Sequence, residues 1–143
     1  MSVTNRQRIW DSELEMTDAG LIAASAAGVV DSAAKIWDTG GGFTQGMLVI
    51  DVTACEIADS DEVYSISVQG STKSDFADTL TDLALIVLGD VTTYTGDVEN
   101  TTGRFLLPFT NMKGAVIYRY VRVYTTIAGT IATGINWTGF ITK

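Results

Sequence analysis

The sequence predicts an all-β protein, a single-domain jelly roll or β-sandwich, and three observations carry that prediction. Short runs rich in Val, Ile and Tyr recur along the chain. Turns rich in Gly, Asp and Ser separate these runs roughly every ten residues, the spacing that sandwiches show. Several runs alternate apolar and polar residues, which is the period of a strand with one buried face. These features are typical of a sandwich, a jelly roll or a small barrel.

The N-terminal residues 1–20 are predicted to form an extended arm, and residues 21–143 the jelly-roll domain. The first twenty residues are polar and sustain no period, although Leu14 and Met16 alternate with acidic residues and hint at a short strand. No run approaches the ~18 apolar residues of a membrane-spanning helix. The acidic residues between Arg8 and Leu21 are unlike a signal peptide. We therefore expect a soluble, unprocessed chain with no membrane partner.

The domain is expected to begin with an extended segment and a loop. Residues 21–34 are small and apolar, and Gly28 followed by two valines favours extended structure over a helix. The sequence DTGGG at 38–42 predicts a loop. Residues 46–54 and 63–70 follow as strands. In 46–54, Met47, Val49 and Asp51 lie on one face and Leu48, Ile50 and Val52 on the other. In 63–70 the alternation assigns Tyr64, Ile66 and Val68 to the core.

The middle of the chain is predicted to contain one short helical stretch between strands. Phe76, Leu80 and Leu83 have helical spacing, which favours one or two turns of helix within the polar connection 71–82. Residues 83–88, LALIVL, form an apolar run of strand length. Residues 104–109 are a further strand, and Pro108 near its end suits an edge position because proline donates no ladder hydrogen bond.

The longest β-rich run is residues 115–126, AVIYRYVRVYTT, and it is expected to form a central strand before a last strand over 131–143. Strand side chains alternate between faces. One predicted face therefore carries Ile117, Val121 and Val123, with Arg119 among them. The opposite face shows phenols and a guanidinium, the groups favoured at interface centres. Its residues are the candidate self-association surface: Tyr118, Tyr120, Arg122 and Tyr124.

Charge is divided unevenly along a chain of net charge −8. Seventeen acidic and four basic residues precede residue 100, giving −13, while five basic and no acidic residues follow, giving +5. This predicts an acidic surface with one basic region. It argues against nucleic acid as a partner, because nucleic-acid binding needs a basic footprint. Arg122 has no carboxylate near it in sequence, so we expect it to cross an interface.

The residue inventory argues against an enzyme and against a cofactor. The chain has no histidine and a single cysteine, Cys55, which removes the usual general base, zinc site and Ser-His or Cys-His nucleophile. Cys55 is expected to be a small core residue. The acidic residues cluster in turns, and Asp59 to Glu62 is one such turn. Solvated loop charge is the favoured interpretation, with a loop Ca²⁺ site and a carboxylate-pair hydrolase as alternatives.

Three tryptophans leave a binding function open. Trp10, Trp37 and Trp137 are able to stack on sugars, so the alternative function is a carbohydrate- or receptor-binding module on a virion surface. The three lie far apart in sequence, which favours anchoring in a core or an interface.

Four segments, taken in order, resemble a known family. They are Asp11-Ser-Glu-Leu-Glu-Met-Thr-Asp-Ala19, the Ala- and Ser-rich stretch 23–34, Tyr64-Ser-Ile-Ser-Val-Gln-Gly-Ser-Thr72, and Tyr120-Val-Arg-Val-Tyr124 before a Gly turn and a last Gly-containing strand. Their order and spacing resemble the capsid cement (decoration) proteins of tailed phages, the family typified by the Bordetella phage cement protein. The glycine loop at 40–42 departs from the family's pattern.

The resemblance implies a jelly roll on the outside of an HK97-like shell, in the virion, assembled in the host cytoplasm. It would associate with itself as a dimer or trimer and bridge neighbouring major capsid proteins, reinforcing the shell. Arg6, Arg8 and Trp10 are the expected anchors of the N-terminal arm on that shell.

Overall fold

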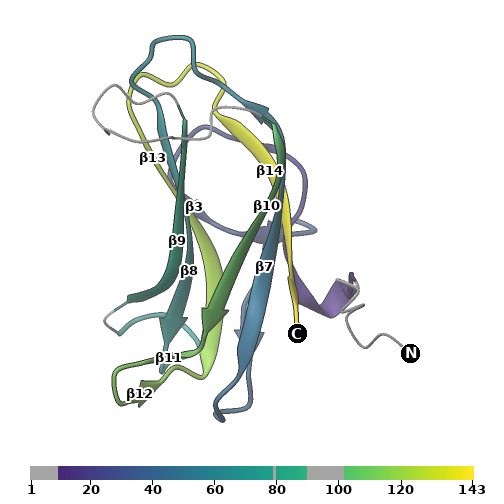
Figure 1. The fold of residues 1–143 in the computed structure, drawn as a ribbon, viewed down its shortest axis with the longest axis vertical. Helices are drawn as coiled ribbons and strands as arrows, with labels where there is room; N and C mark the ends of the chain where they lie inside the picture. Colours follow the sequence, from purple (N-terminus) through teal and green to yellow (C-terminus); the bar gives the residue numbers. More distant parts are fainter. Residues whose placement is uncertain (1–9, 79, 90–101) are drawn as a thin grey trace.

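The computed structural model describes residues 10–78, 80–89 and 102–143, and in them the chain forms two antiparallel β-sheets packed face to face (Figure 1). The first sheet contains β1 (Glu15–Thr17), β2 (Leu21–Ile22), β7 (Gln45–Cys55), β10 (Gly103–Thr110) and β14 (Ile135–Thr142). The second contains β3 (Ala26–Ala27), β6 (Trp37–Asp38), β8 (Val63–Ser71), β9 (Thr81–Gly89) and β13 (Tyr120–Ala128). The predicted all-β sandwich is confirmed.

Smaller elements complete the described chain. Two short hairpins are formed by β4 (Val29–Val30) with β5 (Ala33–Ala34), and by β11 (Met112–Lys113) with β12 (Val116–Ile117). A 3₁₀ turn, η1 (Ser12–Leu14), precedes β1. No helix in the described ranges is long and apolar enough to cross a membrane.

The strand order is that of a jelly roll. The strand order in the first sheet is β1-β14-β7-β10, and β2 pairs with another part of the β14 edge that β1 occupies. The order in the second sheet is β3-β13-β8-β9, and β6 pairs with another part of the β13 edge that β3 occupies. Chain neighbours therefore lie largely in opposite sheets, as two nested Greek keys require. β9 and β10 are the long edge strands, and the expected edge position of Pro108 is confirmed on β10.

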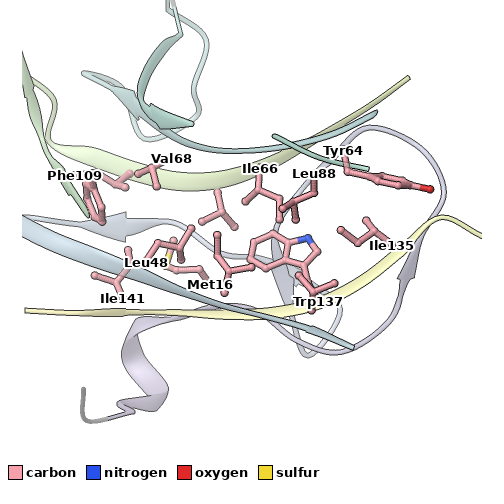
Figure 2. Close-up of a cluster of buried hydrophobic side chains, with 14 of the residues drawn as sticks. Met16, Leu48, Tyr64, Ile66, Val68, Leu88, Phe109, Ile135, Trp137 and Ile141 are labelled. Carbon is pink, nitrogen blue, oxygen red and sulfur yellow. The ribbon is translucent and has the colours of Figure 1, made fainter. Parts of the chain in front are cut away.

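The core lies between the two sheets and contains Tyr64, Ile66 and Val68, the residues predicted to face it from 63–70 (Figure 2). From β7, the face with Leu48, Ile50 and Val52 is the one that packs into this core. Val121 and Val123 join them from β13. Trp137 of β14 is fully buried at the centre, and its Nε1 donates to Thr125 Oγ1 at 3.1 Å. The indole thus buries a large apolar area without leaving its N–H unpaired. Tyr64 is satisfied similarly, through its hydroxyl to the Glu56 carbonyl at 2.9 Å.

The N-terminal residues are more integrated than an arm over 1–20 implies. β1 pairs with β14, and Met16 is fully buried in the core (Figure 2). Asp11 caps η1 by accepting a hydrogen bond from the Glu13 N–H at 3.0 Å. The apolar side chain of Met16 explains the difference, because its burial draws the flanking backbone into the sheet. The domain therefore includes residues 11–17, while residues 1–9 lie outside the described residues.

The predicted helical turns in 71–82 are wrong: among the described residues this stretch is a loop leading into β9. Asp78 closes the loop by accepting hydrogen bonds from Ser71 Oγ and from the backbone and hydroxyl of Thr72, the latter two at 2.9 and 2.6 Å. Phe76 has a positive φ of 54° and is buried. These local hydrogen bonds compete with helix formation, as Asp and Ser side chains commonly do.

The strand expected over 115–126 begins only at Tyr120. Val116 and Ile117 instead form β12 in a hairpin, where Ile117 is exposed and not on the core face predicted for it. A turn at Gly114, with φ +62°, connects β11 to β12 in this hairpin. The Tyr118 N–H donates to the Asn111 carbonyl at 2.7 Å, which holds the chain out of the sheet until residue 120.

Candidate interface on the outer face of the second sheet

Tyr120, Arg122 and Tyr124 project from the outer face of the second sheet, where β13 lies between β8 and the short strands β3 and β6. All three are half-buried, while the alternate residues Val121 and Val123 are fully buried. The predicted separation of the two faces is thus confirmed from residue 120 onward. A central strand fixes these side chains against neighbours on both sides, which is the setting a precise contact surface needs.

Arg122 is held between two aromatic rings. Its Cζ lies 4.4 Å from the centroid of the Phe76 ring and 5.2 Å from that of Tyr124. Its Nε donates to Gln69 Oε1 at 3.0 Å, and Gln69 Nε2 in turn donates to Asp82 Oδ1 at 3.4 Å. Burial lowers the pKa of the Arg122 guanidinium from its usual value, since the surroundings remove water from a charge.

The polar row Arg122–Gln69–Asp82 follows from strand register. Arg122 pairs with Gln69 across β13 and β8, and Gln69 pairs with Asp82 across β8 and β9. Side chains directly opposite each other on one face of a sheet are in contact range. The register therefore connects the arginine to a carboxylate through one intervening amide and not directly.

Phe76 reaches Arg122 because the 72–78 loop folds over the outer face. The side chain is only 7% exposed although it lies in a loop. Its anchor is Asp78, whose hydrogen bonds to Ser71 and Thr72 lower the pKa of that carboxyl to about 2. The loop is thus pinned beside the ring that packs on the guanidinium.

Arg122 differs from the other arginines in its charge environment. Arg104 pairs with Asp51 at 2.6 Å, and Arg119 pairs with Asp38 at 2.8 Å. Within the described parts of the chain, Arg122 has no carboxylate within ion-pair distance and makes one hydrogen bond. A guanidinium has five N–H donors, so most of its capacity is left for a partner.

Exposed apolar side chains flank this arginine. Leu85 of β9 is 52% exposed and lies in the same cross-strand row as Ser67 and Tyr124. Leu80, just before β9, is also exposed. We call the surface formed by Leu85, Phe76, Arg122, Tyr120 and Tyr124 the Tyr-Arg face. It combines aromatic, aliphatic and arginine side chains, the types enriched at interface centres.

The other predicted interface residues are not part of the Tyr-Arg face. Tyr118 was expected on it but packs against Gly70 instead. A Cβ added at Gly70 would lie only 2.8 Å from the Tyr118 Cβ, and Leu83 contacts the same side of Gly70. Its hydroxyl accepts from Thr81 Oγ1 at 3.0 Å. Trp10 lies on the outer face of the first sheet, beside Phe140. Arg6 and Arg8 lie outside the described residues.

Sequence reasoning missed Gln69, Phe76, Asp82 and Leu85. Alternation in VYSISVQG did place Gln69 on the polar face of its strand. Phe76 was interpreted as part of a helical stripe, and Leu85 as part of an apolar run without a defined face. The β8–β13 register places Gln69 opposite Arg122, the β8–β9 register adds Asp82 and Leu85, and the 72–78 loop brings Phe76 to Arg122.

The acidic residues of the 56–62 turn hold loops together. Glu62 is fully buried, and its two carboxylate oxygens accept the backbone N–H groups of Asp59 and Asp61 at 2.7 and 3.0 Å. Asp61 accepts the backbone N–H and the hydroxyl of Thr130 at 3.0 and 2.9 Å. Solvated loop charge was predicted for these residues. In the structure, their carboxylates instead accept hydrogen bonds from the protein's own N–H and hydroxyl groups.

Glu56 makes the densest of these contacts. Its carboxylate accepts the N–H groups of three successive residues, Ala132, Thr133 and Gly134, at 2.7 to 3.1 Å. These backbone hydrogen bonds, with that from Gly134 the strongest, lower its pKa from the usual value. Carboxylate oxygens of Glu56, Asp59 and Glu62 lie within 4.8 Å of one another, in the turn for which a Ca²⁺ site was the alternative to solvated charge.

Cys55 packs against the core at the end of β7, as predicted. Burial raises the pKa of its thiol, with a smaller contribution from the nearby Glu62 carboxylate. A raised thiol pKa disfavours the thiolate, which is the nucleophilic form.

Comparison with protein-family models and with curated proteins finds no match for this chain. The functional argument therefore uses the residues and the geometry described above.

Proposed function

We propose that this protein is a capsid cement (decoration) protein of a tailed phage. In this proposal it binds the outside of an HK97-like shell, associates with further copies of itself, and stabilises the shell by bridging neighbouring major capsid proteins. It acts by contact alone, without catalysis or a cofactor. The resemblance in the order of four sequence segments supports this assignment, and the jelly roll is the fold that it implies.

The observation that carries the proposal is the Arg122 stack on the Tyr-Arg face. The guanidinium is already packed against Phe76 and Tyr124, so little conformational freedom is left to lose on binding. It is partly desolvated and lacks a carboxylate among the described residues. An acidic group on a partner would complete its charge pairing, which favours specific docking over non-specific adhesion.

The exposed leucines give the same face an apolar component. Leu85 and Leu80 lie at the β9 edge of the sheet, beside the aromatic residues. Many copies bound to one shell multiply a modest contact through effective concentration. The net charge of −8 supports a protein partner over nucleic acid.

Co-sedimentation with empty shells tests the proposal, with two arginine variants compared. Arg122→Ala removes the stacked guanidinium, and we expect shell binding to weaken by at least about tenfold, a loss of about 1.4 kcal/mol. Arg104→Ala is the matched control, because it removes an arginine that is already paired with Asp51 and lies on the other sheet. Binding by the control should equal that of the unmodified protein.

Light scattering of the purified protein measures self-association in the same series. A dimer or trimer that dissociates in Arg122→Ala and persists in Arg104→Ala assigns the Tyr-Arg face to contacts between copies. Equal shell binding and equal oligomeric state for both variants would contradict the role proposed for this face. Absence of shell binding by the unmodified protein would overturn the function itself.

A further inference from the structure

A groove of about 350 Å³ lies on the outer face of the first sheet, opposite the Tyr-Arg face. Phe140 and Gly139 of β14 contribute one part of its lining. The remaining lining residues are an aromatic ring and polar or charged side chains: Trp10, Glu15, Asp51, Arg104 and Thr138. A groove of this size and mixed lining suits a small ligand, since specificity in such sites comes from a few polar groups beside apolar surface.

Trp10 is the tryptophan that remains available to a ligand. Its side chain is 56% exposed, while Trp37 and Trp137 are buried in the core. Trp37 and Trp137 are thus anchored in the core, which is the interpretation that the sequence favoured over sugar stacking. An exposed indole beside a groove offers a flat apolar ring with a polar edge, which suits a ligand that has an apolar face and polar rim.

The Asp51–Arg104 pair supplies the polar part of the groove. Arg104 Nε and Nη2 donate to the two Asp51 carboxylate oxygens at 2.6 and 2.8 Å. Their side chains are 55% and 32% exposed, so both remain accessible from solvent. In this geometry unused acceptor lone pairs of Asp51 lie beside unused N–H donors of Arg104.

Strand register adds a hydroxyl to this pair. Thr138 of β14 lies opposite Asp51, and Asp51 lies opposite Arg104 of β10, so the three form one row across the sheet. Adjacent hydroxyl groups on a sugar ring each donate and accept a hydrogen bond. A row that alternates hydroxyl, acceptor and donor groups is complementary to them.

The charges in the groove select among sugars. Glu15 and Asp51 carry two negative charges against the one positive charge of Arg104. This excess disfavours acidic sugars and phosphorylated ligands, because like charges repel at short range. A neutral sugar avoids that repulsion and still uses the hydrogen-bonding groups.

From these features we propose that the Trp10 groove is a binding site for a neutral pyranose saccharide. The sugar ring stacks on Trp10, and its vicinal hydroxyls bind the Asp51–Arg104 pair and Thr138. This site is separate from the Tyr-Arg face and does not depend on the proposed capsid function.

Acrylamide quenching of tryptophan fluorescence gives a direct test, because Trp10 is the exposed tryptophan of the three. The probes are maltose, cellobiose, lactose and chitobiose, with glucuronic acid as the charged comparison. We expect at least one neutral disaccharide to protect Trp10 from quenching in a saturable titration, with a Kd of about 1 mM. Glucuronic acid should give no saturable protection.

Calorimetric titration of variants assigns the site. Trp10→Ala and Asp51→Asn should each weaken binding by at least about tenfold. Trp10→Phe, which keeps an aromatic ring, should retain part of the affinity. Phe43→Ala is the matched control, because Phe43 is an exposed aromatic residue in a different loop. Thermal unfolding of each variant checks that the fold is intact.

Three results would overturn the proposal. One is the absence of saturable protection by every neutral disaccharide. Another is unchanged saccharide affinity in a folded Trp10→Ala protein. The third is a Trp10→Ala variant that loses shell binding while the unmodified protein binds no saccharide, which would make Trp10 a protein contact.

Discussion

The two ends of the sandwich are closed by different chemistry. At one end, the carboxylates of Glu56 and Asp61 join the turn 56–62 to the 129–134 loop by accepting its backbone N–H groups, and Glu62 closes the turn itself by accepting from Asp59 and Asp61. At the other end, the 39–44 loop is joined to the 111–118 hairpin by the side-chain amide of Asn111. A carboxylate loses its acceptor strength when protonated, whereas an amide does not titrate.

The difference shows why an acidic chain can still have well-closed loops. Carboxylates are strong acceptors for backbone N–H groups, which otherwise require water or another residue's carbonyl. The acidic side chains near residue 60 therefore stabilise the loops at one end of the sandwich. The amide at the other end both donates and accepts, so a single residue joins two segments there. Three experiments test whether one end depends on carboxylates and the other on the Asn111 amide.

The largest effect is expected from Asn111→Ala. Asn111 is fully buried; its Nδ2 donates to Thr39 Oγ1, the Gly42 carbonyl and the Tyr118 carbonyl, and its Oδ1 accepts from the Thr44 N–H at 2.8 Å. Removing the amide leaves several buried groups unpaired, at about 1–3 kcal/mol each. We expect the free energy of unfolding to fall by about 4 kcal/mol, measured by urea denaturation.

Asn111→Asp is the matched variant for this position. It keeps the shape and the acceptor for Thr44 but loses the amide donors. We expect it to be destabilised nearly as much as Asn111→Ala. A loss below about 1 kcal/mol in both variants would show that the 39–44 loop does not depend on this amide.

A smaller loss is expected from Glu62→Ala at the carboxylate end. The change removes a fully buried side chain whose oxygens accept from Asp59 and Asp61. Hydrogen bonds to a charged group contribute about 1.5–3 kcal/mol, so we expect a loss of about 2 kcal/mol in urea denaturation. Glu62→Gln retains one side-chain oxygen acceptor, so its free energy of unfolding should lie between those of the unmodified protein and Glu62→Ala. Equal stability of the unmodified protein, Glu62→Ala and Glu62→Gln would show that the Glu62 carboxylate does not stabilise this end of the sandwich.

The smallest and most local effect is expected from acid acting on Glu56. Its folded-state pKa is lowered by the backbone N–H groups of Gly134, Thr133 and Ala132. A lowered folded pKa means that the stabilisation is present above the unfolded value and is lost as the pH falls through the folded pKa. The 129–134 loop should therefore loosen in acid, while the contact of the Thr44 N–H with the Asn111 amide should persist.

Hydrogen–deuterium exchange, corrected for the intrinsic pH dependence of exchange, measures this difference. Protection of the Ala132 to Gly134 amides should fall between about pH 5 and about pH 2, and protection of the Thr44 amide should not. Glu56→Gln should show reduced protection already at neutral pH. Parallel loss of protection at both ends would contradict the contrast between carboxylate and amide closure.

Much of the fold could be predicted from the sequence because strand alternation is a local property. The inward set of residues 63–70, the division of 46–54 into two faces, the buried valines of β13 and the edge position of Pro108 all follow from neighbours in the chain. Which face of 46–54 points inward was decided by the packing of the two sheets. The failures lie where a residue's partner is remote. Ile117 and Tyr118 left their predicted faces because Asn111 binds the chain beside them.

The candidate interface was predictable only in part. Tyr120, Arg122 and Tyr124 share a face because of their spacing, which the sequence contains. Phe76 and Gln69 complete the arginine's surroundings, and their placement needed the fold of the 72–78 loop and the β8–β13 register. The grouping of Trp10 with Asp51 and Arg104 likewise required β14, β7 and β10 to pair.

The sequence alone predicted an all-β sandwich and a strand with one apolar side and one Tyr-Arg side, in a chain with no histidine and a single cysteine. These properties depend on residue type and on a period of two. Tertiary structure alone decided that Arg122 is stacked between rings, that the turn carboxylates close loops, and that one tryptophan of three stays exposed. Each of these depends on segments brought together across the chain, where side-chain contacts and burial arise only once the sheets have paired and packed.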